Sequence, residues 1–188
     1  MSQQPVGERV RVRAEEPEDR DALRTVVGKA FGGERVPDLV DDLRTGPAWL
    51  GLSFVADLDG EVVGHVAFTR AWVDTPDGAV VEVLVLSPLS VLPERQRAGV
   101  GQALVEGAFA LLADRPEPLV FLEGSPDYYG RLDFVAAGTL GFTRPSVHIP
   151  EAAFQARPLP SYDDRLAGAL VYPDAFWRHD AVGLRHRP

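Results

Sequence analysis

The spacing of apolar residues changes along the chain from helical to strand-like and back, which predicts a mixed α/β fold. After a short alternating stretch at residues 10–12, apolar side chains recur every three or four positions at residues 23–31 and again at 36–43. This is the period of an amphipathic helix, so two consecutive helices are expected. The second should end at Gly46 and Pro47, which both disfavour a helix.

Three stretches of alternating apolar and polar residues follow and predict an antiparallel meander. Turn sequences at residues 59–60 and 76–78 separate the stretches, and both contain the Asp-Gly pair that is typical of hairpins. The three expected strands cover residues 52–56, 62–73 and 80–91.

Helical spacing returns at residues 100–112, and Pro116 and Pro118 end it. The short apolar run at 119–122 is typical of a buried central strand. Strand, helix and strand in this order predict one parallel βαβ crossover joined to the meander. The expected fold class is α/β (α+β), with a mostly antiparallel central sheet.

The chain changes character after residues 141–142, where prolines become frequent and the periodicity weakens. We therefore expect residues 9–150 to form the main domain. Residues 151–188 are expected to be an extension that packs on this domain and ends in a loose tail.

Composition and charge exclude several functions. The net charge is -9 and the basic residues are scattered, which disfavours nucleic acid as a partner. Cysteine is absent, so disulfides, thiolate metal sites and a cysteine nucleophile are excluded. No apolar run reaches the roughly 18 residues of a membrane span, and the first residues lack an apolar secretory signal. We expect a soluble, cytoplasmic protein.

The most informative segment, residues 84–101, is a strand that is interrupted and then becomes a helix through glycines. Pro88 has no N–H group, so a bulge or splay is expected there. Gly99 and Gly101 would let a ligand approach the main chain, and the first N–H groups of the helix have no partner inside it. These amides and the helix dipole predict an anion site, with a purely structural turn as the alternative.

This segment resembles the acetyl-CoA signature of the Gcn5-related N-acetyltransferases (GNAT), which reads Gln or Arg, x, x, Gly, x, Gly or Ala. Here residues 96–101 read Gln-Arg-Ala-Gly-Val-Gly. The order of elements at residues 10–145 is similar to that of the family, which implies a sheet with helices on both faces. Residues 126–131, Pro-Asp-Tyr-Tyr-Gly-Arg, resemble the Pro-x-Tyr-Tyr-Gly-Arg segment of a bacterial subgroup.

The resemblance implies that acetyl-CoA is the cosubstrate. Main-chain N–H groups would hold its pyrophosphate at Gln96, Arg97, Ala98, Gly99, Val100, Gly101 and Gln102. Main-chain groups would hold its pantetheine arm at Leu89, Ser90 and Val91. Tyr129 would protonate the departing thiolate, whereas a packed pair of Tyr128 and Tyr129 is the structural alternative.

The chain departs from the family where Gly-Phe usually follows this tyrosine. It has Asp133-Phe134 at that place, and Gly141-Phe142 follows further on. Asp133 would either alter the acceptor pocket or be a surface replacement.

The general base stays open. Glu82 and Glu123 lie where a carboxylate could face the cleft, and each could equally be a solvated charge at a strand edge; water chains are a further alternative. The four histidines lack the spacing of metal ligands, so no metal is expected.

The leading hypothesis is an acetyl-CoA-dependent N-acetyltransferase, in which an amine attacks the thioester directly. The alternatives are a non-catalytic acyl-CoA-binding module or sensor and an interaction domain without a cofactor. The negative charge favours a cationic acceptor, a small-molecule or peptide amine. The sequence identifies neither this amine nor the oligomeric state, and a homodimer remains open.

Overall fold

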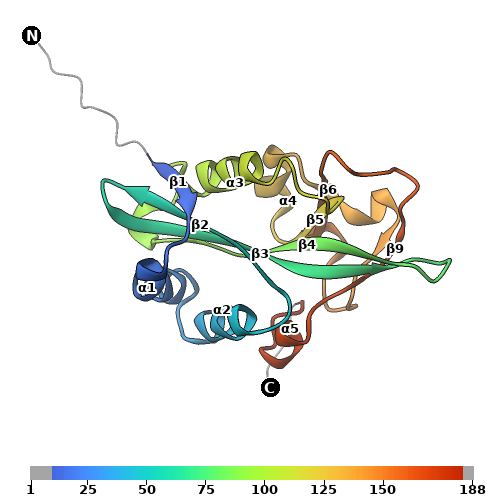
Figure 1. Cartoon of the computed structure of the whole chain (residues 1–188), viewed down its shortest axis with the longest axis horizontal. Coiled ribbons are helices and arrows are strands. Elements are labelled where there is room, and N and C mark those ends of the chain that lie inside the picture. The colour runs from blue at the N-terminus through green and yellow to red at the C-terminus, as the bar shows by residue number, and fades with distance from the viewer. Residues whose placement is uncertain (1–9, 184–188) are drawn as a thin grey trace, which may run out of the picture.

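In the computed structural model, which describes residues 10–183, nine strands form one sheet with helices on both faces (Figure 1). The strand order is β1-β2-β3-β4-β5-β8-β6, while β9 pairs with β3 and β7. The strands are β1 Arg11–Ala14, β2 Trp49–Leu58, β3 Glu61–Asp74, β4 Val80–Val91, β5 Leu119–Glu123, β6 Val135–Ala136, β7 Phe142–Thr143, β8 Phe154–Pro158 and β9 Gly168–Val171. The predicted fold class is confirmed.

Helices α1 and α2 lie on one side of the sheet together with α5, and α3 lies on the other side with α4 (Figure 1). The apolar stripe of α1 is buried at Leu23, Val26 and Val27, as its spacing predicts. The helices are α1 Arg20–Phe31, α2 Arg35–Thr45, α3 Val100–Leu111, α4 Pro126–Tyr129 and α5 Asp174–Arg178.

The predicted meander of β2, β3 and β4 is confirmed, with both pairs antiparallel. The turn between β2 and β3 has Asp59 and Gly60 at positive φ, 53° and 89°. A two-residue hairpin turn of this kind needs such angles at both positions. The N–H of Gly60 donates to the carboxylate of Asp57 at 2.8 Å, which fixes the turn.

Strand β4 is irregular near Pro88, as its missing N–H predicts. The register between β3 and β4 shifts between Val66 and Phe68, which leaves an extra residue on β4. On its other side, β4 pairs in parallel with β5 only at Leu84 and Val85. The sheet therefore opens between these strands beyond Val85.

The sheet does not end at residue 150. Strand β8 pairs antiparallel with all of β5, and β9 pairs with the far end of β3. Residues 151–188 thus contribute two strands to the same sheet, and a cut at 150 would expose the edge of β5. Residue 9 and the expected loose tail, 184–188, lie outside the described residues.

Candidate active site

The separation of β4 and β5 opens a cavity of about 410 Å³. The cavity is bounded by the junction of α1 and α2, by both strands and by residues 172–183. Leu86 and Leu89 of β4 line it, and Glu123 and Tyr129 lie at its β5 side. Two residues of the predicted catalytic set therefore share one cavity.

The loop between β4 and α3 presents free main-chain amides. Among residues 10–183, no acceptor is found for the N–H groups of residues 97–102, and the first bond of α3 runs from Ala103 N–H to the carbonyl of Gly99 at 2.9 Å. Arg97 and Gly99 both have positive φ, 60° and 84°. Turns of this kind gather successive N–H groups into a concave anion site. The loop therefore fits a pyrophosphate.

The two glycines of the signature have different structural reasons. A Cβ on Gly99 would meet no atom within 4 Å, so the space beside it is open to a ligand. A Cβ on Gly101 would lie 2.5 Å from the hydroxyl oxygen of Tyr128. Gly101 is thus needed by a neighbouring tyrosine, a reason that the motif alone does not reveal.

The polar side chains of the predicted cosubstrate site are bound within the protein. Gln96 donates its amide N–H to the carbonyl of Val91 at 3.0 Å and joins the loop to β4. Gln102 donates to Glu106 at 2.8 Å, along the exposed face of α3. The side chain of Ser90 is buried. These residues can contribute to anion binding mainly through their main chain.

Tyr129 is held by a continuous series of aromatic rings that begins in the core. Its ring meets Phe134 edge-on at a centroid distance of 5.6 Å, and Phe134 meets Phe109 in the same way at 5.8 Å. Phe109 contacts Phe68 in turn. Burial raises the pKa of the Tyr129 hydroxyl, so this group is protonated at neutral pH and can donate a proton.

Glu123 is a half-buried carboxylate at the end of β5. It accepts a hydrogen bond from the N–H of Gly183 at 2.9 Å. The buried hydroxyl of Tyr172 faces it without a well-aligned hydrogen bond. Burial raises the pKa of Glu123 because the charged form loses its water, which makes the carboxylate a stronger base.

Comparison with known proteins agrees with this geometry. The family described as "Acetyltransferase (GNAT) domain" matches residues 11–137, more than half of the chain. The chain belongs to the GNAT acetyltransferases. A curated relative, the uncharacterized N-acetyltransferase YjhQ of Escherichia coli K12, is 37% identical over 140 residues, which cover 71% of this chain and 74% of YjhQ.

Two solved structures resemble this GNAT chain over nearly its whole length. The E. coli GNAT family N-acetyltransferase YhbS, solved in complex with CoA, superposes with a TM-score of 0.83 at 26% identity, covering 94% of this chain and 97% of YhbS. A GNAT family acetyltransferase from Brucella melitensis, solved with acetyl-CoA, gives 0.72 at 30% identity, covering 90% and 99%.

The structure does not bring Glu82 to the cavity. This residue lies on the part of β4 that is still paired with β5, before the strands separate. Its carboxylate is exposed and forms an ion pair with Arg70 at 3.3 Å. Glu82 therefore occupies the solvated strand edge that was the alternative for it, and of the two carboxylates only Glu123 lines the cavity.

The departure at Asp133 has a local explanation. Asp133 has a φ of 62°, in the left-handed region where glycine is favoured and where aspartate is one of the better-tolerated substitutes. Its side chain is 82% exposed and faces Arg157 at 3.5 Å. The following Phe134 is buried against Tyr129. Asp133 is thus a surface replacement in a turn, and it does not line the cavity.

Three residues of the cavity carry no signal in the sequence. Tyr172 and Gly183 follow β9, and Arg35 begins α2, far from the glycine segment. Only the pairing of β9 with β3 places the C-terminal residues beside Glu123. Their polar character and their position after a strand are the sole hints that the chain offers.

A buried polar cluster lies in the sheet near α2. His65 is fully buried, and its Nε2 lies 2.8 Å from the hydroxyl of Ser53. Ser53 donates to Glu15, which accepts two hydrogen bonds from Arg44. Burial, and secondarily the charge of Arg44, lowers the pKa of His65 to about 3. The histidine is therefore neutral in the folded protein at neutral pH.

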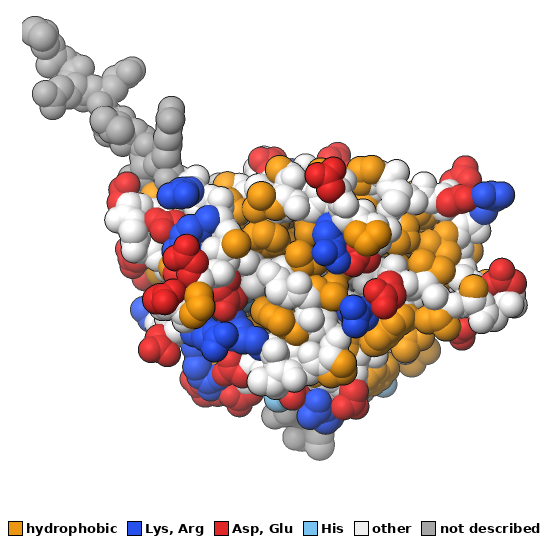
Figure 2. Space-filling view, viewed as in Figure 1, with side chains coloured by type: hydrophobic (Ala, Val, Ile, Leu, Met, Phe, Trp, Pro, Cys, Tyr) orange, Lys and Arg blue, Asp and Glu red, His pale blue; other side chains and the backbone are white. Residues whose placement is uncertain are grey.

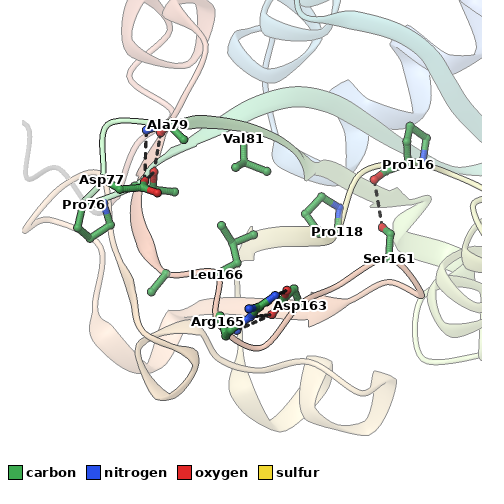
Figure 3. A pocket seen from close by; sticks show the side chains of 12 residues that line it. Pro76, Asp77, Ala79, Val81, Pro116, Pro118, Ser161, Asp163, Arg165 and Leu166 are labelled. Carbon is green, nitrogen blue, oxygen red and sulfur yellow. Dashed lines mark hydrogen bonds and ion pairs between the residues drawn. The ribbon is translucent and has the colours of Figure 1, made fainter.

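A second hollow, of about 690 Å³, lies between the β3–β4 hairpin and residues 161–167 (Figure 3). Its charged groups are already paired, since Arg165 donates to Asp163 in the same loop. Ser161 donates to the carbonyl of Pro116. None of the predicted site residues lines it, so it offers no free group for acetyl transfer.

Basic and acidic side chains are interspersed on the face seen in Figure 2, and apolar side chains gather toward the β3–β4 hairpin. Arg24 of α1 illustrates the mixing, because its guanidinium meets Glu34, Asp38 and Asp41 of the next loop and helix. Across residues 10–183 there is no group of three metal-ligating side chains, and no helix in that range is long and apolar enough to cross a bilayer.

Proposed function

We propose that this GNAT acetyltransferase transfers an acetyl group from acetyl-CoA to an amine by direct attack of the amine on the thioester. The observation that carries the proposal is that Tyr129 and Glu123 line the cavity that opens where β4 leaves β5. The complexes of YhbS with CoA and of the Brucella protein with acetyl-CoA support the identity of the donor.

The donor would be bound mainly by main-chain groups. The amides of residues 97–102 have no acceptor among the described residues and would surround the pyrophosphate, with the open space beside Gly99 for its close approach. The main chain of residues 86–91 on the β5 side of β4 is left unpaired by the splay and would receive the pantetheine arm. Because the protein carries a net charge of -9, these contacts must outweigh a long-range repulsion.

Acetyl-CoA supplies an activated acetyl group as a thioester. An amine arrives as an ammonium ion and must lose a proton before its nitrogen can form the new C–N bond. Glu123 is the proposed base, because burial makes its carboxylate more basic and it faces the cavity. When the C–S bond breaks, the hydroxyl of Tyr129 gives its proton to the departing sulfur, and solvent restores that proton.

Exchange of Tyr129 for Phe tests this assignment. The ring and its contacts with Phe134 remain, so only the hydroxyl is lost. Turnover should fall by about 10²- to 10⁴-fold, while calorimetry finds the same affinity for acetyl-CoA. The control is Tyr162→Phe, a tyrosine that does not line the cavity.

Two outcomes would contradict the proposal. Near-normal turnover of Tyr129→Phe would return this residue to a packing role. A protein that binds acetyl-CoA but releases thiol with no amine, among polyamines, aromatic amines and peptides, would favour the non-catalytic acyl-CoA-binding module instead.

A further inference from the structure

The wall of the cavity around the proposed reaction centre is largely apolar. Helices α1 and α2 contribute Phe31, Val36 and Leu39, and the C-terminal segment contributes Phe176. Phe31 is 50% exposed although it is a large aromatic residue at the end of a helix. An exposed aromatic ring at the mouth of an apolar cavity is well suited to cover the body of a ligand.

Two charged side chains of this cavity have opposite signs and lie in different layers. Glu123 belongs to the sheet, while Arg35 is the first residue of α2 in the helical layer. Arg35 is exposed, and within residues 10–183 its guanidinium forms no hydrogen bond or ion pair. The arginine nearby on α1, Arg24, is by contrast paired with three carboxylates. Asp180 also lines the cavity but is engaged in another interaction.

We propose that the acceptor is a primary amine on an apolar, preferably aromatic body whose opposite end carries a carboxylate. The amine would lie at Glu123, the body against Phe31, and the carboxylate at Arg35. This inference rests on the proposed function and adds the class of acceptor to it.

The physical reasons are separate for each part of the acceptor. A guanidinium binds a carboxylate through two parallel N–H···O bonds, which discriminates strongly against a ligand without that group. An apolar wall stabilises a ring or branched chain and gives nothing to a hydrated polyamine. A cavity of about 410 Å³ is in the range of small-molecule sites. A zwitterionic acceptor also avoids repulsion by the negative protein.

The test compares four acceptors with acetyl-CoA in a thiol-release assay: 4-(2-aminoethyl)benzoate, phenethylamine, phenylalanine and spermidine. The first has its amine and carboxylate at opposite ends of a ring. Its kcat/KM should exceed that of phenethylamine by about tenfold, the value of one charge-assisted contact. Spermidine, which has no apolar ring, should be the poorest acceptor.

Arg35→Ala should abolish the preference for 4-(2-aminoethyl)benzoate over phenethylamine by raising the KM of the former, with the KM of acetyl-CoA unchanged. The matched control is Arg20→Ala, because Arg20 is likewise an exposed first residue of a helix but does not line the cavity. Phe31→Ala should raise the KM of both aromatic amines. Its control is Leu111→Ala, another half-exposed last residue of a helix.

The inference is overturned if spermidine is the best acceptor, if Arg35→Ala affects 4-(2-aminoethyl)benzoate and phenethylamine equally, or if the KM of acetyl-CoA rises instead. Faster reaction of phenylalanine than of 4-(2-aminoethyl)benzoate would also overturn it, since the carboxylate would then lie next to the amine. In each of these cases amine acetylation itself stands. Failure of every amine to release thiol would instead refute the proposed function.

Discussion

Exchange of Gly124 for Ala should disable the enzyme by moving Tyr129. A Cβ on Gly124 would lie 2.3 Å from Cε2 and 2.7 Å from Cδ2 of the Tyr129 ring. The backbone of Gly124 cannot retreat easily, because its N–H donates to Ala153 at 2.9 Å and its carbonyl accepts from Gln155 at 3.0 Å. The ring must therefore move, and ordinary contact at 3.4 Å requires a shift of about 1 Å.

The expected cost has two parts. Overpacking a well-filled site lowers the free energy of unfolding by about 1–3 kcal/mol, which urea denaturation measures. A displacement of about 1 Å in a catalytic group lowers kcat by about 10²-fold. The matched control is Gly130→Ala, one residue beyond Tyr129, where a Cβ would meet nothing within 4 Å.

A double substitution separates the two parts. In a Tyr129→Phe background the ring is unchanged, so Gly124→Ala should cost the same stability. It should lower kcat little further, because the hydroxyl is already gone. An unchanged kcat for Gly124→Ala in the wild-type background would refute the reasoning. So would a full additional loss of kcat in the Tyr129→Phe background, since the effect would then not act through this hydroxyl.

Three further predictions concern the cosubstrate loop, the base and the fold. Gly99→Val should weaken acetyl-CoA binding in calorimetry by about tenfold or more because it fills the open space at the amides. Gly78→Val, at nearly the same φ of 85° in the distant hairpin, should not, and equal affinities for the two variants would contradict the site. The rate should fall as the pH drops through the raised pKa of Glu123, because the base is then protonated; Glu123→Gln should remove this limb, and an unchanged pH profile would exclude the carboxylate. Because the pKa of His65 is lower in the folded protein (about 3) than in the unfolded chain (about 6.5), the unfolded chain binds the proton first, so lowering the pH from 7 to 5 should cost the wild type roughly 2 kcal/mol more than His65→Gln in urea denaturation, and parallel losses would disprove it.

Local periodicity was sufficient to predict most of the elements. The apolar stripes of α1 and α2, the turn at Asp59 and Gly60 and the helix after Gly99 all depend on contacts or backbone angles within a few residues. The interruption at Pro88 could be predicted for the same reason, since a proline removes a hydrogen-bond donor wherever it stands in a strand. Resemblance to a known family then assigned a chemistry to the glycines that follow.

What surrounds the reaction centre was decided by the tertiary structure. Glu82 and Glu123 each follow a plausible strand pattern, and only the point at which β4 leaves β5 distinguishes the exposed one from the one in the cavity. Tyr172 and Arg35 reach the same cavity because β9 pairs with β3 and because α2 packs over the sheet. These contacts join residues far apart in the chain, and no local period records such long-range pairing. The sequence by itself therefore determined the elements and the anion-binding loop, while long-range strand pairing and helix packing determined which charged groups meet the acceptor.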